Sequence, residues 1–180
     1  VRHFGLVLDM GEWQGLADRL VAHAQERVVL ALPGIHDVLG KALLEASNRL
    51  PGRVVVILDP TRDALQQMQD TLASRQGLQS IHILSHGSQS EVTLGDLRLN
   101  QGNLASHAGA LAAIGASLAT DGDILLYGCD IGAGSEGQAL VDEIARLTQA
   151  DVAASTDATG ASQEGGDWNL EYSSGVIQTS

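Results

Sequence analysis

The sequence of 180 residues contains a single cysteine, Cys129. One cysteine excludes an internal disulfide and a zinc site built from several thiolates. Cationic residues are also scarce, because 10 Lys and Arg stand against 22 Asp and Glu, for a formal net charge of -12. This balance argues against nucleic acid as a partner and against a polybasic membrane anchor, since both need a cationic surface. No apolar run approaches the roughly 18 residues of a membrane-spanning helix, so we expect no membrane insertion.

The apolar content is sufficient for a buried core. Hydrophobic residues make up 44% of the chain and charged residues 18%, whereas disordered segments combine low hydrophobicity with high charge. The length corresponds to one domain, and the sequence shows no internal repeat and no linker long enough to divide it. We therefore expect a single domain over residues 1–180, in which residues 1–50 could form an appended βα unit.

Short aliphatic runs alternate with amphipathic stretches along the chain. Runs typical of strands occupy residues 4–9, 28–32, 54–58, 81–85, 123–127 and 151–155. Helical spacing of apolar residues covers residues 12–25, 36–50, 104–118 and 136–148, and a further helix follows Asp59. This alternation favours a three-layer α/β sandwich, whose mainly parallel sheet is covered on both faces. Residues 92–99 predict a β-hairpin after the strand at 81–85, and residues 168–177 predict a C-terminal hairpin.

Reactive side chains follow two of the predicted strands. The strand at residues 81–85 leads into His86 and Gly87, and Cys129 comes shortly after the strand at residues 123–127. Ligands of open parallel sheets bind at the carboxyl ends of the strands, so we expect both side chains at one edge. If the strands are neighbours, His86 and Cys129 lie within one or two spacings of about 4.8 Å, near enough for the imidazole to serve a cysteine nucleophile. The N–H groups of Gly87 and Cys129 could then hold a developing oxyanion.

The motifs that close these strands resemble two groups of proteins. Ser85-His86-Gly87 and Tyr127-Gly128-Cys129-Asp130 resemble the His-Gly and Cys motifs of caspase-like cysteine peptidases, a group that includes caspases, gingipains, clostripain, legumain and separase. Over about residues 54–171, the chain resembles a domain of uncharacterised function found in very large bacterial surface and adhesin-like proteins. The matching stretches are Ile81–Gly87, Leu94-Gly95, Asp123–Asp130, Ala150–Ser155, Thr159–Ala161 and Gly165–Glu171.

The resemblance implies a caspase-like fold and a His–Cys dyad. His86 would act as general base and acid and Cys129 as the nucleophile, with the Gly87 and Cys129 N–H groups as the oxyanion hole. The implied substrate is a polypeptide, possibly the parent chain, and the implied activity is autoprocessing without a cofactor. The implied location is the surface of a bacterium or the medium, where the domain belongs to a larger protein.

By the same resemblance, the strand at residues 151–155 and the loop after it would line the pocket for the residue before the scissile bond. Ser155, Asp157 and Asp130 are the candidate pocket residues. Asp157, Glu164 and Asp167 crowd this loop, and a carboxylate in the pocket would favour Arg or Lys in the substrate. Acidic loops could equally bind Ca²⁺, but the D-x-D-x-D-G spacing of a calcium-binding loop is absent.

A histidine metal site is excluded by spacing. His82 and His86 share one face of the predicted strand but lie roughly 13 Å apart, too far to ligate one ion. We expect His82 in the core or at the entrance of the strand.

Two other interpretations remain open. A buried structural Cys129 and a hydrogen-bonded His86 would make the domain a catalytically inactive module for adhesion or surface presentation. Alternatively, Gly132, Gly134 and Gly137 match the G-x-G-x-x-G pattern of dinucleotide-binding loops, between a strand and a helix. Against this alternative, a loop separates the strand from Gly132, and the motif falls late in the chain rather than in the first βαβ unit.

Overall fold

The aliphatic runs form the strands at the centre of the fold. The computed structural model describes residues 27–31, 53–59, 61–160 and 162–178. The elements in chain order are β1 (Arg27–Ala31), β2 (Arg53–Ile57), α3 (Ala64–Leu72), β3 (Leu78–Leu84), β4 (His86–Ser88), β5 (Glu91–Leu94), β6 (Leu97–Asn100), η1 (Leu104–His107), α4 (Ala108–Gly115), β7 (Leu118–Tyr127), α5 (Gly134–Thr148), β8 (Asp151–Ala154), η2 (Ser162–Glu164) and β9 (Tyr172–Ser173).

The strands and helices predicted from residue 53 to residue 155 are confirmed, with ends that differ by a few residues, except that the helix predicted at 104–118 divides into η1 and α4 and ends before β7 begins at Leu118. The strand predicted at residues 28–32 is β1. The predicted strand at residues 4–9 and the predicted helices at 12–25 and 36–50 lie outside the described residues.

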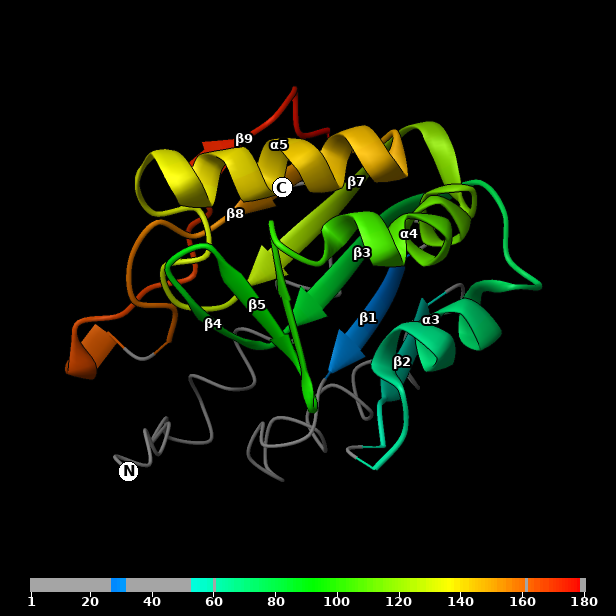
Figure 1. Cartoon of the computed structure of the whole chain (residues 1–180), viewed down its shortest axis with the longest axis horizontal. Helices are drawn as coiled ribbons and strands as arrows, with labels where there is room; N and C mark the ends of the chain where they lie inside the picture. The colour runs from blue at the N-terminus through cyan, green and yellow to red at the C-terminus, as the bar shows by residue number, and fades with distance from the viewer. Residues whose placement is uncertain (1–26, 32–52, 60, 161, 179–180) are drawn as a thin grey trace.

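Six strands form one sheet in the order β2-β1-β3-β7-β8-β9 (Figure 1). The pairs from β2 to β8 are parallel, and β9 runs antiparallel to β8. This mainly parallel open sheet confirms the predicted α/β class. The C-terminal antiparallel pairing forms between β8 and β9, rather than within residues 168–177. The tail is held on β8 because Ser174 N donates to Val152 O (2.9 Å) and Val152 N donates to Ser174 Oγ (3.0 Å).

Alternate residues of the strands divide the sheet into two buried faces. One face packs with the helices α3, α4 and α5, which lie together on one side in Figure 1, and forms the main hydrophobic core. Its strand residues include Ile81, Ile124 and Val152, and the helices supply Met68 and Leu140 among others. The opposite face is also buried, with His82, Leu84, Leu125 and Ala153 at 2–4% exposure. Burial on both faces is the pattern expected for a three-layer α/β fold.

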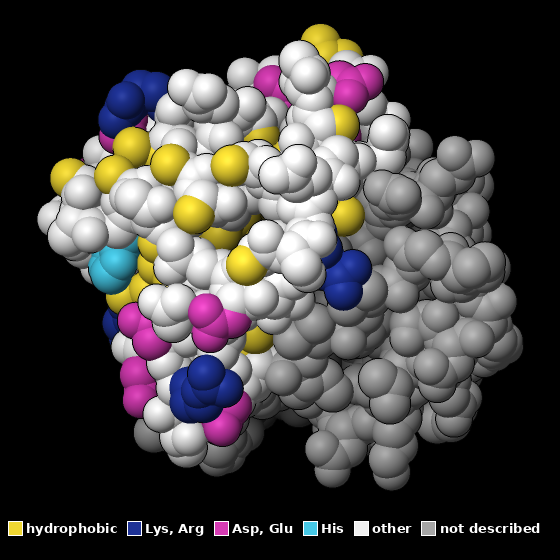
Figure 2. Space-filling model, turned by 90° about the vertical axis from the view of Figure 1, so that its right-hand side faces the viewer, with side chains coloured by type: hydrophobic (Ala, Val, Ile, Leu, Met, Phe, Trp, Pro, Cys, Tyr) yellow, Lys and Arg dark blue, Asp and Glu magenta, His cyan; other side chains and the backbone are white. Residues whose placement is uncertain are grey.

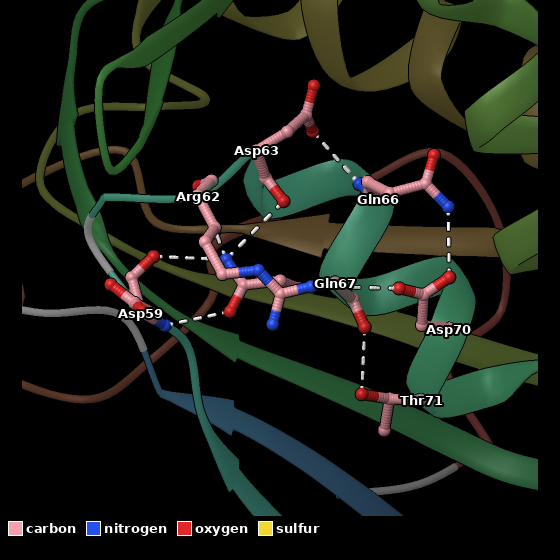
Figure 3. A network of polar contacts seen from close by, with 7 residues as sticks. All are labelled: Asp59, Arg62, Asp63, Gln66, Gln67, Asp70 and Thr71. Carbon is pink, nitrogen blue, oxygen red and sulfur yellow. Dashed lines mark hydrogen bonds and ion pairs between the residues drawn. The ribbon is translucent and has the colours of Figure 1, made fainter.

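A network of polar contacts fixes the start of α3 (Figure 3). The Asp63 carboxylate caps the helix by accepting a hydrogen bond from Gln66 N (2.9 Å). The buried Gln67 amide holds the preceding loop, because it accepts from Asp59 N (2.8 Å) and donates to Asp59 O (3.0 Å). Hydrogen bonds from Thr61 lower the pKa of the Asp59 carboxyl.

A second, small sheet has the order β4-β5-β6 and follows β3 directly. Its strands β5 and β6 pair antiparallel around Gly95-Asp96, which confirms the predicted hairpin. Gly95 has a φ of 64°, a conformation that favours glycine in such turns. The sequence did not predict β4, which places His86 and Gly87 in a strand paired with β5.

The surface in Figure 2 carries charges of both signs. Acidic and basic side chains of the described residues lie next to one another on this face, and hydrophobic side chains occur in small groups. Ion pairs join Arg98 to Glu91 (2.8 Å) and Arg146 to Glu143 (2.6 Å). Among the described residues, no helix has the length and apolar content needed to cross a membrane.

Candidate functional site

The two candidate catalytic residues follow the ends of two neighbouring strands. β3 and β7 pair directly and in parallel, with Leu84 opposite Tyr127. Ser85 N extends this pairing by donating to Tyr127 O at 2.8 Å. Both strands point toward the same end of the sheet (Figure 1), so His86 and Cys129 follow at one edge. β3 and β7 are therefore neighbours, which is the condition under which we expected His86 and Cys129 to lie near one another.

The segments that contain these residues are in backbone contact. A Cβ atom added to Gly87 would lie 2.7 Å from Cys129 O, and one added to Gly128 would lie 3.1 Å from both Gly87 N and Ser85 O. Contacts this short leave room only for hydrogen atoms, which explains glycine at both positions. The candidate oxyanion donors, Gly87 N–H and Cys129 N–H, thus belong to adjoining segments.

The two candidate side chains differ in exposure. His86 is exposed, whereas Cys129 is partly buried. The Cys129 thiol donates a hydrogen bond to Thr159 O at an S–O distance of 3.7 Å. Within the described part of the chain, the Cys129 N–H donates to no backbone carbonyl. A partly accessible thiol can act as a nucleophile, and an N–H group that donates to no carbonyl of the protein can donate to an oxyanion.

The turn after Cys129 is bound to the loop that follows β8. Asp130 N donates to Asp157 O and Gly132 N donates to Ser155 O, both at 2.8 Å. Asp130 has a φ of 59°, a left-handed conformation that Asp tolerates better than most residues and that reverses the chain here. The three candidate pocket residues, Asp130, Ser155 and Asp157, are therefore brought together beside Cys129.

The three pocket residues do not have equal access to a ligand. Asp130 and Asp157 are exposed, but Ser155 is completely buried. The Ser155 hydroxyl donates to Asp157 O at 3.1 Å. Ser155 therefore positions the Asp157 loop instead of facing an open pocket.

A cluster of three carboxylates lies at this loop. One oxygen each of Asp157, Asp167 and Glu171 lies within 4.8 Å of the others. Desolvation, followed by the charges of Glu171 and Asp167, raises the pKa of the Asp157 carboxyl. Because Ca²⁺ prefers carboxylate oxygens, these are the residues of the described chain that could hold such an ion. Glu171 was not predicted as a member of this cluster, because it lies 14 residues after Asp157 in the chain and joins it only in the folded protein.

Aromatic rings extend from the buried sheet face to this loop. The rings of His82 and Tyr127 stack with centroids 5.9 Å apart, and Trp168 packs against Tyr127 at 6.2 Å. His82 is 2% exposed, and its Nε2 lies 3.1 Å from Ser80 Oγ, so of the two positions expected for it, the core and the entrance of the strand, His82 occupies the core. The half-buried Trp168 thus contacts the strand that leads into the site.

The glycines of the G-x-G-x-x-G match are required by contacts within the protein. A Cβ atom on Gly137 would lie 2.6 Å from Ile131 O, and one on Gly132 would lie 3.3 Å from Tyr172 Cβ. Gly134 has a φ of 65°, at the start of α5. Close packing and turn geometry therefore explain these glycines without a bound nucleotide.

Comparison with known proteins places the chain in a family. Residues 33–180 match the model of a domain of unknown function (DUF4347), and the chain belongs to this family. No curated protein matches the chain. Among solved structures, it is similar to the aromatic-amino-acid aminotransferase from Burkholderia pseudomallei covalently bound to pyridoxal phosphate, at 17% identity and a TM-score of 0.40. This similarity covers 81% of the chain but 35% of the aminotransferase, and a TM-score this low carries no argument about function.

Proposed function

We propose that the domain is a cysteine endopeptidase of the caspase-like type, with Cys129 as the nucleophile and His86 as general base and acid. The observation that supports it most directly is the in-register pairing of β3 and β7, which the two residues follow at one edge of the sheet. Both residues have access to solvent, because His86 is exposed and Cys129 is partly buried. Placement at one edge of the sheet with access to solvent supports the assignment of Cys129 as a nucleophile and His86 as its proton acceptor.

In the proposed reaction, the Cys129 sulfur bonds to the carbonyl carbon of the scissile peptide, and His86 takes the thiol proton. The negative charge on the carbonyl oxygen is held by the Gly87 and Cys129 N–H groups. The C–N bond then breaks, and the leaving amine takes the proton from His86. Water attacks the resulting thioester, His86 accepts its proton, and cleavage of the C–S bond releases the acid and restores the thiol.

The exposed carboxylates beside Cys129 favour a cationic substrate. Asp130 and Asp157 border the turn that carries the thiol, and Asp167 and Glu171 add negative charge next to Asp157. We infer a preference for Arg or Lys before the scissile bond. Profiling a peptide library varied at that position tests this inference, and a preference for acidic or aliphatic residues would contradict it.

The parent chain is the substrate we propose, at the surface of a bacterium and within a larger protein. The test compares processing by the domain with its native flanking sequences in four forms, namely wild type, Cys129→Ala, His86→Ala and His107→Ala. His107 lies in η1 and serves as the matched histidine control. We expect processing in the wild type and in His107→Ala, and none in the other two variants. Equal processing in all four forms, or in none of them, would refute the peptidase.

A second candidate function is a catalytically inactive module for adhesion or surface presentation. The observation in its favour is the hydrogen bond from the Cys129 thiol to Thr159 O, which gives the cysteine a structural contact. The two functions differ in the reactivity of the native thiol toward iodoacetamide. Catalysis predicts that the folded protein is labelled faster than the unfolded one, and an inert native thiol favours the inactive module.

A further inference from the structure

Ile131 fills the space between the two segments of the candidate site. Its side chain is completely buried and belongs to the hydrophobic core. A Cβ atom on Gly87 would overlap Cγ1 of Ile131, and one on Gly128 would lie 2.9 Å from Cδ1. The same side chain therefore packs against the backbone on both sides of the site, where β3 passes into β4 and where β7 ends.

The backbone of Ile131 is held on the opposite side. The preceding residue, Asp130, and the following residue, Gly132, each donate a hydrogen bond to the loop after β8 at 2.8 Å. A Cβ atom on Gly137 would lie 2.6 Å from Ile131 O, so α5 packs closely on its carbonyl. With its main chain fixed by the loop after β8 and by α5, the stiff β-branched side chain projects toward Gly87 and Gly128 in one position.

We propose that Ile131 is a positioning residue, which sets the separation between the N–H groups of Gly87 and Cys129. This inference rests on the proposed peptidase function, in which those two groups hold the oxyanion. The Ile131 side chain has no polar atom, and because it is buried it does not touch a substrate. It acts through the two glycines, whose freedom of φ and ψ would let the backbone shift into any cavity left behind.

Kinetics of the domain with its native flanks provide the first test, with a fluorogenic peptide that carries Arg before the scissile bond. The loss of one oxyanion donor lowers kcat about 10²–10³-fold in other enzymes, so we expect Ile131→Ala to lower kcat about 10²-fold with KM changed less than about twofold. Ile131→Val, which retains the branch at Cβ, should stay within about tenfold of the wild type.

Ile144→Ala is the matched control, because Ile144 is also a core isoleucine, at 3% exposure, but lies in the body of α5. Both alanine variants should lower the melting temperature. When each variant is assayed at a temperature below its thermal unfolding transition, only Ile131→Ala should lower kcat. Equal kcat values for the two variants would overturn the inference.

Backbone order parameters from NMR relaxation test the same inference without catalysis. We expect Ile131→Ala to lower the order parameters of the Gly87 and Cys129 N–H groups from the rigid value of about 0.85 toward about 0.6, with no such change in Ile144→Ala, because the two segments lose their common packing partner. Unchanged order parameters at both amides would overturn the positioning role. If the wild type cleaves no peptide yet the order parameters fall in Ile131→Ala, the peptidase fails while Ile131 still holds the two groups.

Discussion

A methyl group added at Gly87 should damage the site and reduce the stability of the fold. The Cβ atom of Gly87→Ala would overlap Cγ1 of Ile131 and would lie 2.7 Å from Cys129 O. Ile131 is completely buried, and Cys129 O belongs to the backbone, so neither can retreat without moving the turn after β7. Overpacking of this kind costs about 1–3 kcal/mol. We expect a loss of about 2 kcal/mol in the free energy of unfolding, which corresponds to about 4–8 °C in Tm.

The matched control is Gly109→Ala in α4. An added Cβ atom at Gly109 meets nothing within 4 Å, and alanine favours a helix over glycine by about 0.5–1 kcal/mol. This variant should therefore be as stable as the wild type or more stable. Removal of the obstructing side chain should also relieve Gly87→Ala, so Gly87→Ala/Ile131→Ala should lose less stability than the sum of its two single variants.

Urea denaturation followed by circular dichroism measures all of these free energies of unfolding. The processing assay of the flanked domain should show a loss of activity for Gly87→Ala and none for Gly109→Ala. A free energy of unfolding for Gly87→Ala within about 0.5 kcal/mol of the wild type, the usual range for a surface substitution, would refute the predicted steric conflict. A loss in Gly87→Ala/Ile131→Ala equal to the full sum of the two single losses would refute it as well.

Three further predictions concern packing and charge. Gly115→Ala would push its Cβ into Thr148 O and should lose about 1–3 kcal/mol in urea denaturation, whereas Gly109→Ala in the same helix should lose none. Met68→Ala removes a side chain with 0% exposure and should lose about 2–5 kcal/mol in the same assay, against less than about 0.5 for the exposed Gln66→Ala. The pKa of Asp157 is raised above its usual 3.8 in the native state. At pH values between 3.8 and the raised pKa, the native state therefore binds more protons than the unfolded state, and the stability of the protein falls as the pH rises through this range. Asp157→Asn should therefore melt at a higher temperature than the wild type at pH 7, and the difference should vanish below about pH 4, while a pH-independent difference in Tm would contradict this assignment.

Local patterns in the sequence were sufficient to predict the elements from β2 to β8 with the exception of the short strand β4. A run of aliphatic residues such as 124–126 is buried on both faces, and that property belongs to the segment itself. The hairpin around Gly95-Asp96 was predictable for the same reason, because turn residues and alternation are read over a few positions. His82 could be assigned to the core because its spacing from His86 excludes a shared metal ion.

The tail and the short strand β4 were not predictable in this way. The sequence of residues 168–177 predicts an antiparallel hairpin, but the strand in this segment, β9, pairs with the open edge of β8. His86 and Gly87 were expected only as the end of a strand, and they pair with β5 in a separate sheet. In both segments the pairing partner is set by which edge the folded chain leaves available, and a short segment contains no information about that edge.

The sequence by itself determined the α/β class and which residues follow the strands, because both depend on composition over a few adjacent positions. Only the tertiary structure decided that β3 and β7 are neighbours in register, which brings Gly87 into contact with Cys129. Tertiary structure also decided that Glu171 joins Asp157 and that Ile131 packs between two glycines. These contacts join segments that are distant along the chain, and their geometry follows from strand order and close packing, which no local pattern encodes.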